Sequence, residues 1–137
     1  LGLSPYYKGS ATNFWPLVNN EPQFLGVSFL KIDKGIDTGP IIHQIRPDLS
    51  ADDNVHDIGN KLIIKTVNVL EKLILNFKNL KGKKQKKIKK EKIFKKRDFN
   101  KIALKKMKFN FKNGLIRKYL NNKPRLDKKF PIVEKNL

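Results

Sequence analysis

The apolar repeat in residues 52–77 constrains the fold of this chain more than any other feature. Residues 50–54 read Ser-Ala-Asp-Asp-Asn and supply the side chains that cap the start of a helix. From there, side chains recur at the spacing of one helical face, which predicts a helix over residues 52–77: Val55, Ile58, Leu62, Thr66, Val69, Leu73 and Phe77. A second stripe widens that face, as is typical of a helix that packs on a β-sheet: Ile63, Val67, Leu70 and Ile74.

Two stretches before this helix have the composition of β-strands. Residues 24–33, FLGVSFLKID, place Val27 and Phe29 on one face and Ser28 and Leu30 on the other. Residues 39–49, GPIIHQIRPDL, form a second strand. The connection between them, KGIDTG, is too short to cross over between parallel strands. We therefore predict an antiparallel hairpin that supplies a sheet for the helix.

Residues 1–26 are rich in proline, glycine and aromatic side chains, and they show no clear period. We predict one short helix over residues 11–18, with Ser10 as its cap. Pro16 would kink or end this helix, because proline is not tolerated inside a regular helix.

Composition narrows the setting of the chain. With 39% hydrophobic residues and nine Phe, a single modest domain can bury a real core. The absence of cysteine excludes disulfides and thiolate metal sites, and it favours a reducing, cytoplasmic compartment. No apolar run approaches the roughly 20 residues that span a bilayer, so we expect no membrane association.

The positive charge is concentrated in one part of the chain. Residues 78–129 hold 23 of the 31 Lys and Arg residues and only three acidic residues, whereas the remainder is almost neutral. This distribution predicts two regions with different roles, residues 1–77 and residues 78–137. The basic region is either a solvated linker in a lysine-rich protein or a weak RNA contact through residues 78–129.

The basic region also contains apolar side chains that are typical of folded structure. Ile88, Ile93, Phe94 and Phe99 indicate a short strand or a docking segment within the lysine run. Further on, a helix is predicted from near Asn113, packed by four apolar side chains: Leu115, Ile116, Tyr119 and Leu120.

The stretch GIDTGPII, residues 35–42, holds Asp37 between two glycines. A plain surface turn explains these residues, because Gly35 and Gly39 tolerate positive φ and aspartate bonds its own backbone in turns. Asp-Thr-Gly is also the active-site tripeptide of aspartic proteases, which need two carboxylates. Only one such tripeptide is present here, Pro40 follows it, and a long helix stands where more strands would be expected. We therefore set the protease interpretation aside.

Two longer segments, LSPYYKGSATNFWPLVNNE and GVSFLKIDKGIDTGPIIHQ, together resemble the central part of the folate-dependent formyltransferase family. Residues 5–9, Pro-Tyr-Tyr-Lys-Gly, match the end of the family's first motif, and Trp15 matches its helix. Asp37 and Gly39 match its later Asp-x-Gly. The resemblance covers residues 1–77 well. Beyond them only three short segments are similar to the family: RDF, NGLIRKYL and the closing Pro-Ile segment.

The resemblance implies an α/β fold: the carboxyl-terminal part of a Rossmann-like domain with a β-hairpin and a long packing helix, followed by a basic tail. It implies transfer of a formyl group from 10-formyltetrahydrofolate to an amine acceptor. Asp37 would be the catalytic carboxylate, no metal would take part, and the folate would contact the surrounding loop: Ile32, Asp33, Lys34, Gly35, Ile36 and Thr38.

The family's catalytic Asn and His would fall immediately before Leu1, so we expect the chain to come from a longer enzyme and to be inactive alone. Neither His43, in the second strand, nor His56, in the first turn of the helix, matches the missing histidine. Formyl transfer therefore stands as the leading hypothesis, with its acceptor open between sugar nucleotide, aminoacyl-tRNA and purine precursor. The alternative is a basic RNA-binding or ribosome-associated module whose first half is only a scaffold.

Overall fold

The fold is that of a computed structural model, which describes residues 1–89 and 91–137. Strands and helices are mixed along the chain, in agreement with the α/β class predicted from the sequence. In chain order they are β1 (Tyr7–Gly9), α1 (Trp15–Val18), β2 (Val27–Leu30), β3 (Ile41–Ile45), α2 (Val55–Leu75), β4 (Lys92–Phe94), α3 (Lys101–Lys112) and α4 (Leu115–Lys129). Single 3-10 turns lie at Pro22–Phe24, Phe77–Asn79 and Lys96–Asp98.

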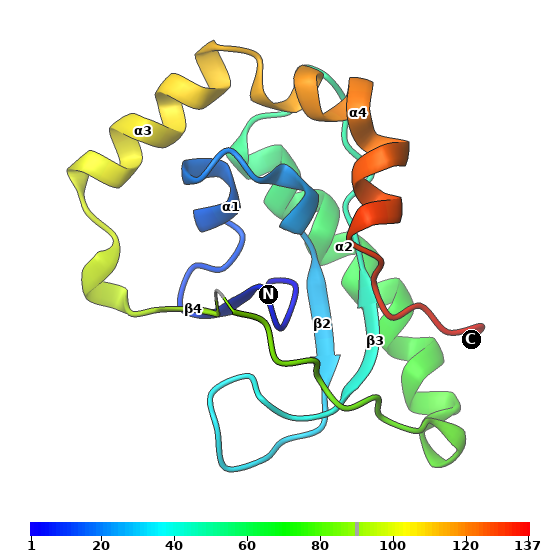
Figure 1. Ribbon diagram of the computed structural model, residues 1–137. Coiled ribbons are helices and arrows are strands. Elements are labelled where there is room, and N and C mark those ends of the chain that lie inside the picture. The colour runs from blue at the N-terminus through cyan, green and yellow to red at the C-terminus, as the bar shows by residue number, and fades with distance from the viewer. Residues whose placement is uncertain (90) are drawn as a thin grey trace.

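The predicted hairpin is confirmed as an antiparallel pair of β2 and β3, both shorter than the sequence indicated. Val27 pairs with Ile45 and Phe29 with His43, and a register shift follows Phe29. Every residue of β3 is buried. α2 lies along the hairpin (Figure 1), the Gln44 side chain donates to the Ser4 carbonyl of the amino-terminal segment, and Gln44 N–H donates to the Val133 carbonyl along the edge of β3 away from β2. The loop 31–40 projects from the end of the hairpin that is far from α3 and α4.

The predicted long helix is confirmed as α2, which begins after Asn54. The Asn54 side chain accepts hydrogen bonds from the backbone N–H groups of His56 and Asp57, and the Asp57 carboxylate accepts one from Asn54 N–H. This reciprocal capping fixes where the helix starts.

On the first apolar stripe of α2, Ile58, Leu62 and Leu73 are buried, whereas Phe77 lies past the end of the helix and is 60% exposed. The prediction that the second stripe also packs is wrong for this chain, since its four side chains are 43% to 65% exposed: Ile63, Val67, Leu70 and Ile74. The hairpin is only two strands wide, so it covers one side of the helix and leaves the other open.

The two parts of the chain that differ in charge share one core. β1 and β4 pair as parallel strands with Tyr7 opposite Lys92 and Gly9 opposite Phe94, although they are far apart in sequence. The rings of Trp15 and Phe94 stack with their centroids 4.3 Å apart. The strand predicted within the lysine run is thus present, and it completes the packing around the amino-terminal residues.

The helix predicted over residues 11–18 is much shorter than expected. α1 begins at Trp15, and Ser10 does not cap it. Ala11 has a φ of +54°, so residues 11–14 form a turn instead of the first helical turn. Pro16 lies within the first turn of α1, where its missing N–H group has no role in the helix.

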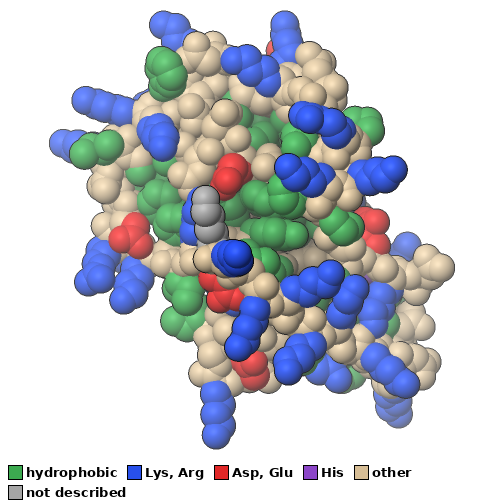
Figure 2. All heavy atoms as spheres, viewed as in Figure 1, with side chains coloured by type: hydrophobic (Ala, Val, Ile, Leu, Met, Phe, Trp, Pro, Cys, Tyr) green, Lys and Arg blue, Asp and Glu red, His purple; other side chains and the backbone are tan. Residues whose placement is uncertain are grey.

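The carboxyl-terminal helices pack through few side chains. α3 buries Ala103 and Met107, and α4 buries Leu115, Ile116 and Tyr119. The helix predicted from near Asn113 is confirmed, with Gly114 at its N-cap. Lys and Arg side chains are spread across the face seen in Figure 2, and apolar side chains gather between them. None of the helices in the described ranges is long and apolar enough to cross a membrane.

Candidate active-site loop

The loop 31–40 is closed at its base and organised by one carboxylate. Lys31 N–H donates to the Pro40 carbonyl at 2.9 Å, which joins the two ends of the loop. Asp33 Oδ1 accepts hydrogen bonds from Gly35 N–H at 3.1 Å and from the Thr38 hydroxyl at 2.6 Å. Asp33 therefore holds the inner turn, although its side chain is exposed to solvent.

Asp37 lies at the bend and takes the strained backbone conformation itself. Its φ is +51°, whereas neither Gly35 nor Gly39 has a positive φ, so the expectation that the glycines supply it is wrong. Aspartate visits this left-handed region more readily than most residues because its short polar side chain bonds locally. Here Asp37 Oδ2 accepts a hydrogen bond of 2.8 Å from Gly9 N–H, at the end of β1.

The two glycines are required for close approach of other atoms. A Cβ at Gly39 would lie 1.6 Å from the Lys31 carbonyl oxygen, and a Cβ at Gly35 would lie 2.1 Å from the Thr38 Oγ1. Any side chain at these positions would open the base of the loop or displace the inner turn. The glycines thus set the position of Asp37 indirectly.

A second anchor for the loop comes from the lysine-rich segment. The Gln85 side-chain amide donates to the Asp37 carbonyl at 2.7 Å and to the Gly39 carbonyl at 2.8 Å. Nearby, Ile41 and Lys83 exchange both backbone hydrogen bonds. Sequence reasoning missed Gln85, and the one signal for it is that a glutamine interrupts the lysine run.

The six residues predicted to contact folate all lie on this one exposed loop. Ile32 is 100% exposed and Ile36 is 58% exposed, so two apolar side chains stand free beside Asp37. Lys34 and Thr38 are exposed as well. The structure brings these residues together, and their contact with a folate stays a prediction.

Neither of the two histidines lies on this loop. His43 is buried in β3, where its Nδ1 accepts a hydrogen bond of 3.1 Å from Lys135 N–H. Burial lowers the pKa of His43, which favours the neutral ring that this hydrogen bond requires. His56 is exposed in the first turn of α2. Neither histidine is placed to act with Asp37.

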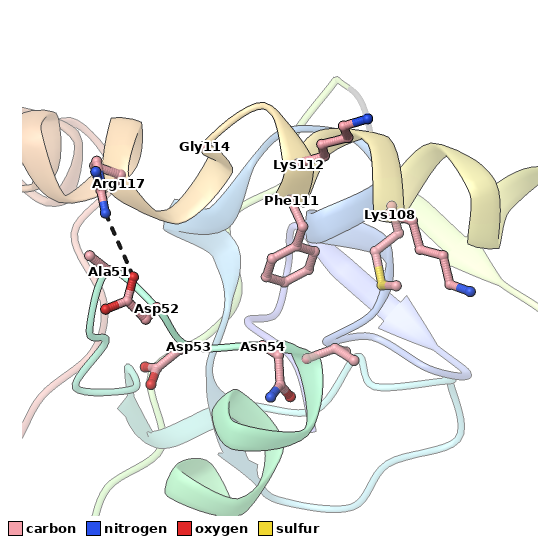
Figure 3. Close-up of a pocket in the computed structure, with 11 residues that line it drawn as sticks. Ala51, Asp52, Asp53, Asn54, Lys108, Phe111, Lys112, Gly114 and Arg117 are labelled. Atoms are coloured by element: carbon pink, nitrogen blue, oxygen red, sulfur yellow. Dashed lines mark ion pairs between the residues drawn. The ribbon is translucent and has the colours of Figure 1, made fainter.

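A larger hollow lies away from the Asp37 loop. It has a volume of about 670 Å³ and separates the start of α2 from the junction of α3 and α4 (Figure 3). Phe111 points into it from one side and Asp52 lies on the other, where Arg117 pairs with Asp52 at 3.6 Å. None of the predicted site residues lines it. A smaller cavity of about 510 Å³ touches the Asp37 loop at Thr38.

Comparison with protein families finds no family model that matches the chain. The chain is 36% identical over 87 residues to the methionyl-tRNA formyltransferase of Thermodesulfovibrio yellowstonii, covering 58% of this chain and 28% of that enzyme. It is 36% identical over 115 residues to the same enzyme of Azobacteroides pseudotrichonymphae, covering 74% of this chain and 35% of the relative. The chain therefore spans about a third or less of these relatives.

Solved structures of formyltransferases also match this chain. The N-formyltransferase of Helicobacter canadensis, crystallised with folinic acid and dTDP-3-aminofucose, matches with a TM-score of 0.63 and 32% identity. The match covers 72% of this chain and 37% of that one. A sugar 3N-formyl transferase crystallised with dTDP and 5-N-formyl-THF also matches with a TM-score of 0.63, at 33% identity. It covers 72% of this chain and 36% of that enzyme.

Proposed function

Because this chain belongs to the folate-dependent formyltransferase family, we propose that it forms part of a site that transfers a formyl group from 10-formyltetrahydrofolate to an amine. One observation carries the proposal: the Asp37 loop has the form that such a site requires. Gly9 N–H holds the carboxylate, Gln85 holds the backbone carbonyl of Asp37, and the loop carries exposed apolar side chains. The folate compounds in the neighbouring crystal structures support the identity of the donor.

Asp37 has one oxygen available for catalysis. Its Oδ2 is held by Gly9, and within the described residues its Oδ1 accepts no hydrogen bond. Formyl transfer passes through a tetrahedral intermediate with a developing oxyanion, which needs hydrogen-bond donors and a route for the amine proton. The family resemblance pairs the aspartate with a histidine. A carboxylate beside an imidazole favours the charged ring, and Asp37 would orient and charge the oxyanion donor in this way.

The rest of the loop would form one wall of the folate site. Ile32 and Ile36 offer exposed apolar surface for the flat pterin ring. The turn held by Asp33 would present its backbone to the ring.

We further propose that residues 1–77 correspond to the carboxyl-terminal part of a Rossmann-like catalytic domain and that residues 78–137 are its basic linker and helical tail. Structural matches over 72% of the chain support a formyltransferase-like domain. Because β4, α3 and α4 share the core of the first region, the tail would fold onto the domain. The RNA-binding alternative gains no support from the comparisons, and a weak RNA contact through residues 78–129 stays a prediction.

A chimaera tests the proposed role of Asp37. Residues 1–137 would replace the matching part of the Helicobacter canadensis enzyme, and turnover of 10-formyltetrahydrofolate would be measured with its sugar nucleotide. We expect Asp37→Asn to lower turnover by about 10² or more, the range typical of a lost proton-transfer or charge-orienting group. The isosteric amide keeps the contact with Gly9, so stability should change by less than about 0.5 kcal/mol.

Asp48→Asn is the matched control. Asp48 is exposed, pairs with Lys65 and lies outside the loop, so this variant should keep the turnover of the parent chimaera. Turnover within a few fold of the parent in Asp37→Asn would show that Asp37 is an ordinary turn residue and would refute the mechanism.

A further inference from the structure

The cavity of about 510 Å³ beside the Asp37 loop has an unusual lining. One wall is the end of β1 with Lys8, one is the loop with Thr38, and one is the lysine-rich segment that follows Gln85. Three elements from distant parts of the sequence therefore meet around one concave surface. Of the residues predicted to be catalytic or to contact folate, Thr38 is the one that lines it.

Lys8 is the most constrained residue of this lining. Its side chain is only 3% exposed, and a lysine buried to this extent normally has its ammonium group fully paired. Lys8 Nζ lies 3.4 Å from Glu91 Oε2, and within residues 1–89 and 91–137 it makes no hydrogen bond. An ammonium group has three N–H donors. The buried lysine thus has more donor capacity than its one distant partner uses.

Further positive charge surrounds the same surface. Lys86, Lys87 and Lys89 line the cavity, whereas Glu91 is the one acidic residue in the described part of its lining. A concave surface lined by one sign of charge concentrates the electrostatic potential and attracts ions of the opposite sign. The cavity is therefore suited to an anion.

Gln85 adds a hydrogen-bond acceptor to a cavity otherwise lined mainly by lysine donors. Its side-chain N–H donors are used by the loop carbonyls of Asp37 and Gly39, which fixes the orientation of the amide. Its Oε1 is buried, and no donor to it is found among the described residues. A buried acceptor without a partner is costly, and a hydroxyl or amine of a bound molecule would satisfy it. An anionic ligand that also carries such donors fits both features.

We propose that this cavity binds a phosphate or diphosphate group. If the proposed function holds, this group belongs to the amine acceptor. Its binding would place the amine near Asp37, whose loop forms one wall of the cavity. Lys8 would be the fixed contact, and Lys86 and Lys87 would supply the attraction from solvent.

Titration of the purified 137-residue chain with inorganic pyrophosphate tests the site directly by calorimetry, without activity as a readout. Lys86→Gln/Lys87→Gln removes two exposed charges at the cavity and should weaken binding about tenfold. Lys105→Gln/Lys106→Gln is the matched control, because it removes two adjacent exposed charges on α3, away from the cavity. We expect this control to change affinity by less than about twofold at the same ionic strength. Equal weakening in both double variants would show only general charge attraction and would overturn the proposal.

Lys8→Met keeps the shape of the buried stem and removes the ammonium group. We expect it to abolish pyrophosphate binding while Trp15 fluorescence still reports a folded core. If Lys8→Met fails to fold, the two double variants still decide the question. Unchanged binding in a folded Lys8→Met protein would exclude Lys8 as the contact.

Two other probes identify the source of the phosphate and separate this proposal from the proposed function. We expect dTDP to bind at least as tightly as pyrophosphate. Tight binding of a CCA RNA trinucleotide with no binding of dTDP or pyrophosphate would contradict the site and favour RNA. In the chimaera, selective pyrophosphate binding with no formyl transfer would support the anion site. It would contradict the assignment of the bound phosphate to the amine acceptor. Formyl transfer that is unaffected by Lys86→Gln/Lys87→Gln, with no selective pyrophosphate binding, would support the proposed function and overturn the anion site.

Discussion

Residues 1–77 are nearly neutral and build their structure from long apolar runs, whereas residues 78–137 are lysine-rich and bury apolar side chains one or two at a time. The first region supplies the hairpin and α2, which the sequence pattern predicts. The second region supplies β4, α3 and α4, which hold Trp15 and the end of β1 in place. Net charge therefore does not mark the edge of the folded unit, because a few apolar contacts bind the basic region to the core.

The largest effect should come from opening the core on the basic side. Ile116 is 2% exposed, and Ile116→Ala should lower the free energy of unfolding by about 2–5 kcal/mol, as Leu62→Ala should in α2. Trp15 fluorescence reports the melting of the first region, since Trp15 is the only tryptophan. Ile102→Ala, at a side chain that is 78% exposed, should have little effect. An unchanged Trp15 transition in Ile116→Ala would mean that the two regions fold separately.

A smaller effect should follow from disturbing the strand pair that joins the regions. Gly9 has a φ of +92°, and a Cβ there would lie 2.2 Å from the Phe94 carbonyl oxygen. Gly9→Ala should therefore destabilise the protein by about 1–3 kcal/mol, measured by chemical denaturation. Gly59→Ala is its counterpart in α2, where a Cβ meets nothing within 4 Å, and it should stabilise by about 0.5–1 kcal/mol. Equal effects of the same sign would contradict this account of the β1–β4 pair.

The smallest effect should be a pH dependence where the chain end meets the hairpin. Burial lowers the pKa of His43, so as the pH falls through the ordinary histidine range near about 6.5 the unfolded chain binds a proton more readily than the folded chain does. Stability should therefore fall as the pH falls through this range, despite the opposing influence of Glu134. Melting temperatures of His43→Phe should depend less on pH than those of the parent, whereas His56→Gln should keep the parental slope.

The sequence predicts those parts of the fold that depend on neighbours in the chain. The alternation in residues 24–33 and the helical spacing of Ile58, Leu62 and Leu73 identify the hairpin and α2. Periodicity does not say how wide the neighbouring sheet is, so the burial of Val67 and Ile74 was predicted wrongly. β1 is three residues long and its partner is distant, so no local pattern indicates it.

In the candidate site, too, the sequence predicts local features and misses those that depend on distant contacts. The resemblance selects the loop that holds Asp37, and the structure shows that its named residues do lie together. The glycines tolerate a left-handed φ at least cost, but in the structure Asp37 adopts it, with its carboxylate bonded to Gly9 N–H. Sequence reasoning misses Gln85 and places Lys8 only within the motif at residues 5–9, because their significance comes from contacts between segments that it treats separately.

The pairing of Tyr7–Gly9 with Lys92–Phe94 sets an order of events during synthesis on the ribosome. The first strand leaves the exit tunnel long before its partner exists, and at about 5–20 residues per second the wait lasts roughly 4–17 s. Throughout that time Tyr7 and Trp15 lack the aromatic ring of Phe94 that later covers them. The hairpin and α2 have no such wait, since their contacts are local. Residues 27–75 should therefore fold first, and residues 7–15 would be the segment that a chaperone holds until Phe94 has emerged from the tunnel.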